Sequence, residues 1–536
     1  MKKIYNMLFL LVVLFLSSCD LNREPETTFT DDKFWKTETD LQYACNRLYN
    51  LLGGFEVDTR ADDLYSGPNS TSNGSWNIPN TNGSWADPYY RIFTANNIIE
   101  KSVNANVKES IKNRYLAEAC FFRAYHYFQL VVKYGDVPLL LHAINDLKDP
   151  LLLSPRTPRE TVLQQVYDDL DFAAAWAPTR ANLAKDQYGR ITKSAALALK
   201  ARVGLYEGTR CKFHNYGDPE KHLKIAVDAA TQVMGEGHVL FANYFDMFQY
   251  AGEGAANKEN IFVKVYGVKT TENALVTHNN SRNLENNYAP TRNLLTQYLC
   301  ADGLPWGTSP LTVKPETSYN DIFANRDPRM GMTFYKIGET AYKGAFVPYG
   351  FGKTGYSIKK GYIQTDWDSN GKAVVDKALI RYAEVLLIYA EAKFELNGSI
   401  SDDDLDKTIN ALRKRVGFNV RLTNQFVADN NLNMRNEIRR ERTVELAAEG
   451  FRYDDIIRWK IAEDVLPVDI MGAKFIDSEW TGTTRASLGS MLSSDDLLIV
   501  ERKDVRKFNP ARDYLYPVPL NEISLSGGSV TQNPNW

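Results

Sequence analysis

The sequence has few of the residues and motifs that catalysis and metal binding require. Its 536 residues include only 6 histidines and 5 cysteines, and no cysteine pair has the spacing of a zinc site. Neither the HExxH motif of zinc hydrolases nor the GxSxG motif of serine hydrolases occurs. The segment Gly352-Lys353-Thr354 does not complete a phosphate loop, because Val347 stands where the first glycine is required. The sequence therefore predicts no catalytic residues, no metal site and no cofactor.

An excess of positive charge is also missing. The chain has 63 basic and 66 acidic residues, and it contains no basic stripe with interleaved aromatic residues. We therefore expect no nucleic-acid partner. Long apolar runs are absent after the N-terminus, so we expect no transmembrane helix in the rest of the chain.

The N-terminal residues have the pattern of a signal peptide. Lys2 and Lys3 precede the apolar run Met7–Leu16, which as a helix would span roughly 15 Å, about half of a bilayer core. The run ends in Leu16-Ser17-Ser18-Cys19, which resembles a bacterial lipobox. The alternative is an ordinary secretory peptide with an incidental cysteine. We expect residues 1–18 to be removed and Cys19 to be acylated, which would anchor the protein to a membrane outside the cytoplasm.

Four further cysteines, Cys45, Cys120, Cys211 and Cys300, are far apart in the sequence. Export would permit disulfides, whereas helical surroundings favour buried free thiols. Both states remain open from the sequence, and neither indicates a function.

Periodic apolar patterns predict a mainly α fold. Helix starts lie roughly 30 residues apart in the first half, similar to tetratricopeptide hairpins, which repeat at about 34 residues. The consensus residues of that repeat are missing, so the expectation concerns packing alone. A long polar loop is expected over Asp58–Asp87, because this segment is rich in Gly, Asn and Ser. The helices expected here are Leu41–Leu52, Ile111–Tyr134, a helix from a capping box at Thr157 to Trp176, Thr192–Glu207 with a stop at Gly208, and Pro219–Gly235.

The helical pattern lapses over Val239–Val375, where a strand at Ile261–Tyr266 alternates with loops. Helices are expected again over Asp376–Leu396, after Ser401 and over Asn433–Trp459. After a signal peptide at 1–18, we expect an N-terminal helical region at 19–235 and a C-terminal region at 236–536, packed together as one compact unit.

Several segments along the chain resemble the SusD/RagB family of outer-membrane nutrient-binding lipoproteins. They occur in the family's order behind the lipobox, over almost the whole mature chain. The segments are Tyr134-Gly135-Asp136-Val137-Pro138-Leu139, Thr192–Glu207, Leu379–Ala392, Ile409-Asn410-Ala411-Leu412-Arg413 with Val416-Gly417, Ile438–Trp459, Tyr516-Pro517-Val518-Pro519 and Gln532-Asn533-Pro534-Asn535-Trp536.

The resemblance implies tetratricopeptide-like hairpins packed with a large irregular, loop-rich portion. It also implies a non-enzymatic protein at the cell surface, in the outer membrane. Such a protein captures a nutrient, usually a glycan, and passes it to a SusC-like TonB-dependent barrel. Two alternatives remain, a peptide-binding member of the same family and a surface glycoside hydrolase.

Charged residues inside the resembling helices have a structural interpretation. Glu445 and Glu449 lie four residues apart on one helix face. A glycosidase needs two carboxyls across a cleft, and this pair is better explained as part of a charge network between helices. The same explanation is preferred for Glu384 and Glu391. Three other residues are expected in the core: Trp35, His126 and Trp459.

Sugars present polar edges and apolar C–H faces, so a sugar site needs aromatic rings with amides and carboxylates at their rims. Two loop regions offer this mixture. The first loop region contains Asp63, Trp76, Trp85 and Tyr89, and the second contains Asn286, Tyr288 and Trp306. We expect Trp85 and Trp306 to stack on the ligand, with further rings beside them and hydrogen bonds from Asp63 and Asn286. The alternative for each tryptophan is a hydrophobic contact that anchors its loop. The predicted ligand-binding residues are Asp63, Trp76, Trp85, Tyr89, Asn286, Tyr288 and Trp306.

Overall fold

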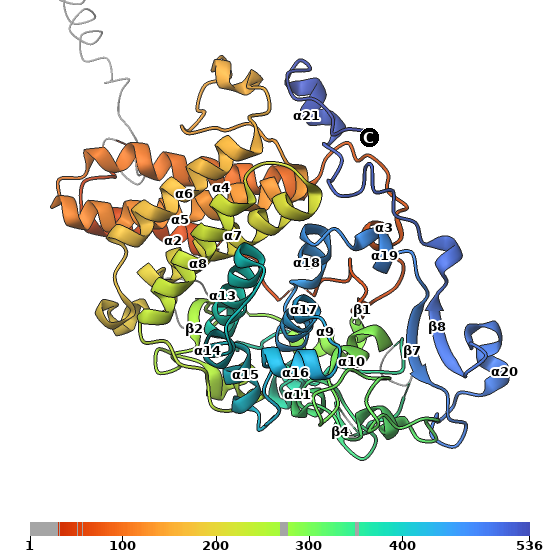
Figure 1. The fold of residues 1–536 in the computed structure, drawn as a ribbon. Helices are drawn as coiled ribbons and strands as arrows, with labels where there is room; N and C mark the ends of the chain where they lie inside the picture. Colours follow the sequence, from red (N-terminus) through yellow and green to blue (C-terminus); the bar gives the residue numbers. More distant parts are fainter. Residues whose placement is uncertain are drawn as a thin grey trace, which may run out of the picture.

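The computed structural model describes residues 31, 33–50, 52–55, 57–267, 277–342, 344–348 and 353–536. The fold is mainly α, as predicted, and long helices gather on one side of the molecule (Figure 1). Successive members of this helical scaffold pack against each other. The scaffold consists of α2 (Glu38–Asn50), α4 (Gly83–Lys101), α5 (Glu109–Tyr134), α6 (Arg159–Trp176), α7 (Lys193–His214) and α8 (Pro219–Gly235).

Local capping explains where several scaffold helices begin. The side chains of Asn82, Thr192 and Asp218 accept hydrogen bonds from backbone N–H groups in the first turns of α4, α7 and α8. The capping box predicted at Thr157 is wrong. The backbone N–H of Arg159 instead donates to Asp136 Oδ1 at 2.8 Å. The cap of α6 therefore comes from the loop after α5.

The predicted stop of the fourth long helix at Gly208 is also wrong, because α7 continues to His214. A Cβ atom on Gly208 would lie 2.7 Å from Leu223 Cγ, and one on Gly204 would lie 2.8 Å from the carbonyl oxygen of His222. Both glycines therefore serve the close approach of α7 and α8 and do not end the helix.

The second half of the chain joins short strands and helices to the scaffold. Four antiparallel strand pairs occur in the described residues: β1 (Leu64–Tyr65) with β3 (Ala289–Pro290), β2 (Asn260–Lys264) with β6 (Lys377–Arg381), β4 (Thr340–Ala341) with β5 (Gly344–Ala345), and β7 (Ile470–Lys474) with β8 (Leu497–Glu501).

The helices of this half are shorter than predicted. The helix expected from Asp376 begins only at Tyr382, because Lys377–Arg381 pairs with β2. The helix expected over Asn433–Trp459 is divided into two. After β6 the helices are α13 (Tyr382–Asn397), α14 (Asp402–Lys407), α15 (Ile409–Arg415), α16 (Asn424–Asp429), α17 (Met434–Glu445) and α18 (Arg452–Arg458). The other short helices of the chain are α3 (Ser70–Asn73), α9 (Asn280–Asn286), α10 (Arg292–Gln297), α11 (Pro328–Thr333), α12 (Gln364–Ser369), α19 (Ala462–Val465), α20 (Arg485–Leu488) and α21 (Leu520–Leu525).

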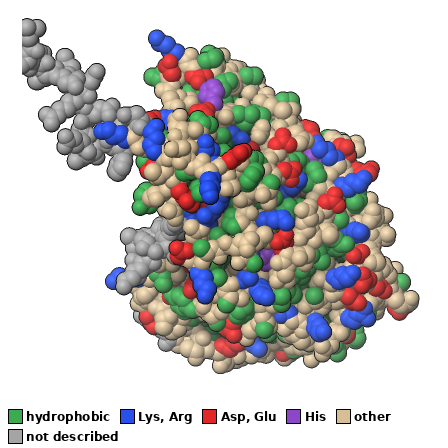
Figure 2. Space-filling view, turned by 90° about the vertical axis from the view of Figure 1, so that its left-hand side faces the viewer, with side chains coloured by type: hydrophobic (Ala, Val, Ile, Leu, Met, Phe, Trp, Pro, Cys, Tyr) green, Lys and Arg blue, Asp and Glu red, His purple; other side chains and the backbone are tan. Residues whose placement is uncertain are grey.

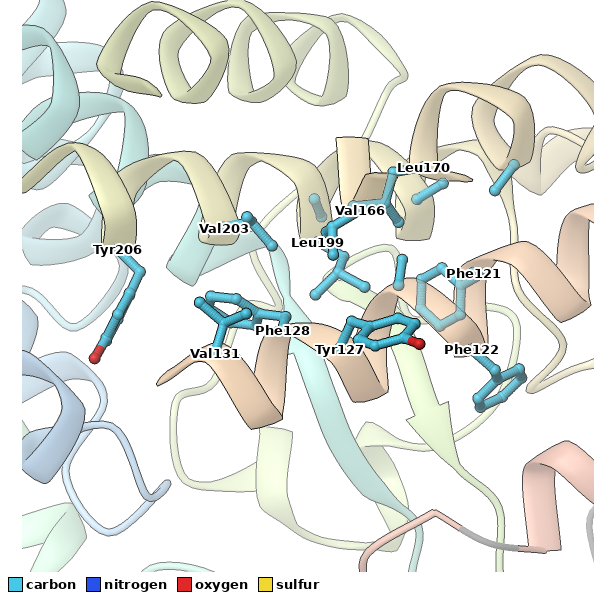
Figure 3. Packing of buried hydrophobic residues seen from close by; sticks show 14 of the residues in the cluster. Phe121, Phe122, Tyr127, Phe128, Val131, Val166, Leu170, Leu199, Val203 and Tyr206 are labelled. Carbon is cyan, nitrogen blue, oxygen red and sulfur yellow. The ribbon is translucent and has the colours of Figure 1, made fainter. Parts of the chain in front are cut away.

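Buried apolar side chains of the described residues form a large core cluster under the scaffold, a second cluster in the irregular half and a third among α13, α14, α15 and α17. Figure 3 shows part of the first cluster, where rings and branched side chains from α5, α6 and α7 converge. The residues of the first cluster come from nearly the whole chain, between Trp35 and Val530. The second includes Leu64 of β1, Leu284 of α9 and Trp480. Trp35, His126 and Trp459 are buried, which confirms their predicted place in the core.

The surface has no single dominant charge on the face drawn in Figure 2, where basic and acidic side chains are intermingled. None of the described helices combines the length and the apolar character needed to cross a bilayer. Cys45, Cys120, Cys211 and Cys300 are buried free thiols, which is the state favoured by their helical surroundings.

Candidate functional site

The pairing of β1 with β3 joins the two loop regions that the sequence analysis selected. Leu64 lies opposite Pro290, and Tyr65 lies opposite Ala289. The backbone N–H of Thr291 also donates to the carbonyl oxygen of Asp63 at 2.9 Å. The loop before α4 therefore meets the irregular middle region, although 226 residues separate Leu64 from Pro290.

Asp63 lies at this junction but is not a surface residue. It is 6% exposed, and its Oδ1 atom has no hydrogen-bond partner among the described residues. Burial, followed by repulsion from Asp62, raises the pKa of Asp63 well above its ordinary value. The neighbouring Asp62 is held by Arg452, with N–O distances of 2.7 and 2.9 Å. Asp63 is thus a buried carboxyl whose surroundings favour the neutral form.

The aromatic residues of the first loop region pack on the first core cluster. Trp76 is partly buried, and its ring centroid lies 4.8 Å from that of Tyr516 and 5.6 Å from that of Trp536. Tyr89 is also partly buried, and its hydroxyl donates to the carbonyl oxygen of Pro138 at 2.8 Å. Trp76 keeps some exposed ring surface next to the C-terminal tail.

The structure corrects the placement of Trp85. The predicted loop over 58–87 ends early, because Asn82 caps α4 and the helix begins at Gly83. Trp85 is therefore helical and 3% exposed. Its ring packs edge-on against Tyr134, with centroids 4.9 Å apart. A ring enclosed in this way has no free face for a ligand, and its position matches the anchoring alternative.

Tyr288 and Trp306 are partly buried and pack on the second core cluster. The Arg326 guanidinium lies 4.4 Å from the centroid of the Trp306 ring. Arg326 itself donates to four backbone carbonyls, those of Leu295, Tyr298, Leu299 and Ile322. Trp306 therefore rests on a rigid support and is partly exposed. The side chain of Asn286 and the whole of Cys19 lie outside the described residues.

The charged residues of the resembling helices form a buried network, as the structural interpretation predicted. Glu445 is fully buried and contacts three guanidinium groups, those of Arg329, Arg381 and Arg415. Burial opposes its ionisation, but Arg415, Arg381 and Arg329 lower the pKa of Glu445 far below its ordinary value. These contacts connect α17 with α11, β6 and α15.

Glu391 and Glu384 have the same role in α13. Glu391 accepts two hydrogen bonds from Arg458, at 2.6 and 2.7 Å, and Glu384 accepts two from Arg202, at 2.6 and 2.7 Å. Burial would raise the pKa of Glu391, but the charge and hydrogen bonds of Arg458 lower it to about 2. These carboxylates attach α13 to α18 and α7.

Within the described residues, one group has the spacing of metal ligands. Glu207, Cys211 and His222 offer ligand atoms that all lie within 4.8 Å of one another. Glu207, however, already accepts from Arg159 at 2.6 Å, and His222 contacts the Tyr167 hydroxyl at 2.7 Å. Burial raises the pKa of Cys211 to about 12, so its thiol keeps its proton. The group is better described as a hydrogen-bonded core cluster than as a metal site.

The sequence analysis missed Tyr516 and Trp536 as neighbours of Trp76. Both lie more than 400 residues further along the chain. The Asn533 side chain donates to the carbonyl oxygens of Tyr134 and Tyr516, at 3.1 and 2.7 Å, which fixes the tail against α5. Only their aromatic character indicated that these residues would pack against other rings.

Comparisons with known proteins agree with this architecture. The model of the SusD family matches residues 239–536, and a model described as starch-binding and associating with the outer membrane matches residues 55–205. A SusD-like protein of Bacteroides ovatus is 27% identical over 83% of this chain and 80% of its own length.

Solved structures are also similar. A SusD-like carbohydrate-binding protein from Bacteroides fragilis is 26% identical, with a TM-score of 0.75 over 92% of this chain and 99% of its own. A laminarin-binding SusD-like protein is 21% identical, with a TM-score of 0.63 over 94% of this chain and 100% of its own. At 21% identity, the similarity to the laminarin-binding protein shows only that the two proteins share a fold.

Proposed function

Because the chain belongs to the SusD family, we propose that it is a cell-surface lipoprotein that binds a glycan and delivers it to a SusC-like TonB-dependent transporter. The observation that carries the glycan part is the similarity, at 26% identity, to a structure described as carbohydrate binding. The match of residues 55–205 to a model described as associating with the outer membrane supports the location. The acylated Cys19 and the transporter partner belong to the same proposal.

We place the glycan contact at Tyr288 and Trp306, with Trp76 and Tyr89 as further rings. Partly exposed rings on a rigid support can stack on sugar C–H groups. Trp306 is partly exposed, and the Arg326 guanidinium supports its ring. Asn286 lies two residues before Tyr288 in the sequence, and we propose that it supplies an amide. Trp85 is left out of the proposed surface because of its burial.

Isothermal titration calorimetry with laminarin and with maltooligosaccharides tests this proposal. Trp306→Ala should weaken binding by about 30-fold, equivalent to about 2 kcal/mol, because a stacking ring at the centre of a contact is lost. Its melting temperature should change little. Trp176→Ala is the matched control, since Trp176 is 40% exposed at the end of α6.

The control should bind as the unaltered protein does. Preserved affinity in Trp306→Ala together with a large loss of stability would show that Trp306 anchors its loop. The glycan site would then lie elsewhere. Absence of binding to every glycan tested would count against the glycan proposal itself.

A further inference from the structure

A cavity lies where the scaffold meets the second half of the chain. It has a volume of about 300 Å³, which is at the lower end of the range for small-molecule sites, roughly 300–1,000 Å³. Its walls come from α5 and α7 on one side, and from β6, the start of α13, the end of α17 and α18 on the other. The cavity is separate from the surface that contains Tyr288 and Trp306, and neither residue lines it.

Aromatic rings form part of the wall. Phe128 of α5 and Tyr206 of α7 pack edge to face, with centroids 5.6 Å apart and planes at 84°. In Figure 3 the Tyr206 hydroxyl points away from the other labelled side chains. Tyr125 and Phe451 complete the aromatic lining. Such rings provide apolar faces that suit the C–H groups of a sugar ring.

The polar lining is predominantly basic, since basic side chains outnumber acidic ones by seven to four. Several of the basic groups are neutralised, as in the bidentate pairs of Arg202 with Glu384 and of Arg458 with Glu391. Arg442 is also paired, since its Nε atom donates to the two oxygens of Asp455 at 3.0 and 2.8 Å. Its Nη1 atom, however, has no hydrogen-bond partner among the described residues.

Two of the lining residues, Arg442 and Tyr206, therefore have a donor without a hydrogen-bond partner among the described residues. Arg442 is 4% exposed and Tyr206 is 5% exposed, and the Tyr206 hydroxyl also finds no partner in the described part of the chain. Burial raises the pKa of Tyr206 to about 12, so the hydroxyl keeps a proton to donate. Buried donors without partners are rare in folded proteins, and one explanation for them is a ligand that accepts from both.

A carboxyl group, that of Asp454, also lines the cavity and lies close enough to Tyr206 to raise its pKa. The side chain of Asp454 is 40% exposed, and its nearest cation is Arg60, with Nη2 at 3.8 Å from Oδ1. That distance is too long for a hydrogen bond. The Asp454 carboxylate can therefore accept hydrogen bonds from hydroxyl groups that enter the cavity.

We propose that this cavity binds one acidic sugar ring, with its carboxylate or sulfate at Arg442 and Tyr206 and its hydroxyls at Asp454. The aromatic wall then contacts the apolar face of the ring. The choice of a sugar rests on the proposed function, whereas the charge preference rests on the lining alone. The site would make the protein selective for glycans that contain uronic acids or sulfated sugars.

Calorimetry with sodium glucuronate, glucose 6-sulfate, glucose and sodium sulfate tests the inference. At least one acidic sugar should bind, and at least tenfold more tightly than glucose, because neutral glucose cannot engage the two buried donors with a charge. The two acidic sugars distinguish a carboxylate from a sulfate. Tyr206→Phe should weaken the binding of the preferred sugar about tenfold, since it deletes one hydrogen bond to a charged group.

Tyr206→Phe breaks no hydrogen bond within the described protein, so its folding should be unaffected. Tyr134→Phe is the matched control, because the Tyr134 hydroxyl is also buried without a partner among the described residues but does not line the cavity. Equal affinity for glucose and both acidic sugars, binding of sulfate alone, or equal loss in both variants would overturn the inference. Failure here with intact binding of laminarin or maltooligosaccharides would leave the proposed function standing.

Discussion

At the scale of single residues, the buried carboxyls fall into two groups with opposite protonation. Glu445 and Glu391 are surrounded by guanidinium groups, which lower their pKa values and keep them charged. Among the described residues, Asp376 has no ion pair of this kind. Burial, with a smaller contribution from Glu253, raises the pKa of Asp376 to about 7. Its carboxyl accepts from the backbone N–H of Tyr266 at 2.9 Å, just beside the β2–β6 pair.

Asp376→Asn should make the protein more stable at pH 8. The folded protein retains the Asp376 proton that the unfolded chain loses near pH 4, so stability falls as pH rises from about 4 to about 7. Asparagine can still accept from Tyr266 but never ionises. We expect a gain on the order of 1–3 kcal/mol at pH 8 and little change at pH 4.5, measured by urea unfolding. Lower stability at both pH values would show that the charge is not the important feature.

Trp85 shows where residue-scale prediction from sequence fails. A tryptophan among Gly, Asn and Ser suggests an exposed ring in a loop. The Asn82 cap starts α4 three residues earlier and turns the same ring into the core. Trp35, His126 and Trp459 were placed correctly, because each lies within or beside a strong helical pattern.

At the scale of elements, glycine has two distinct roles that sequence alone does not separate. Gly398 ends α13 with a φ of 71°, close to the helix end predicted at Leu396. Gly208 lies in the interior of α7 and permits contact with α8. Nothing near Gly208 in the sequence reveals that another helix will occupy the space of its missing side chain.

Gly208→Ala should destabilise the protein, although alanine normally stabilises a helix interior by roughly 0.5–1 kcal/mol relative to glycine. The new Cβ would lie 2.7 Å from Leu223 Cγ and 2.9 Å from its backbone nitrogen. We expect a loss of about 1–3 kcal/mol from overpacking, measured by thermal or urea unfolding.

Gly235→Ala is the control for this substitution. Gly235 is the last residue of α8, and its Cβ would meet nothing within 4 Å. This variant should be as stable as the unaltered protein or slightly more stable. A gain of stability in Gly208→Ala would mean that α7 and α8 separate easily and that their contact is not tight.

At the scale of the whole molecule, the sequence predicted the fold class and the family. Both depend on patterns that repeat over many residues. It did not predict the strand pairs, the division of the aromatic residues between two core clusters, or the packing of Trp536 on Trp76. Each of these depends on contacts between distant segments, such as Leu64 with Pro290. The predicted boundary between residues 235 and 236 stays a prediction.

Attachment to the membrane is the whole-molecule property that Cys19 should control. Cys19→Ala should leave the protein unprocessed or release it from the membrane fraction, because the acyl chains are lost. Recovery of a large β-barrel partner from solubilised outer membranes should fall as well. Cys120→Ala is the control, since its thiol is buried in α5. An unmodified Cys19 in the intact mass of the native protein would refute the lipid anchor.

The extent of the first core cluster bears on how the chain reaches its folded state. Helices α4 to α8 contact their sequence neighbours, so we expect them to assemble early. The strand pair between Leu64 and Pro290 should form later, because it must close a loop of more than 200 residues. The cluster is complete only when Val530 and the tail beside Tyr134 are in place. A nascent chain emerging outside the cytoplasm would therefore expose apolar helix faces until its last residues arrive, and that interval is when periplasmic chaperones would matter most.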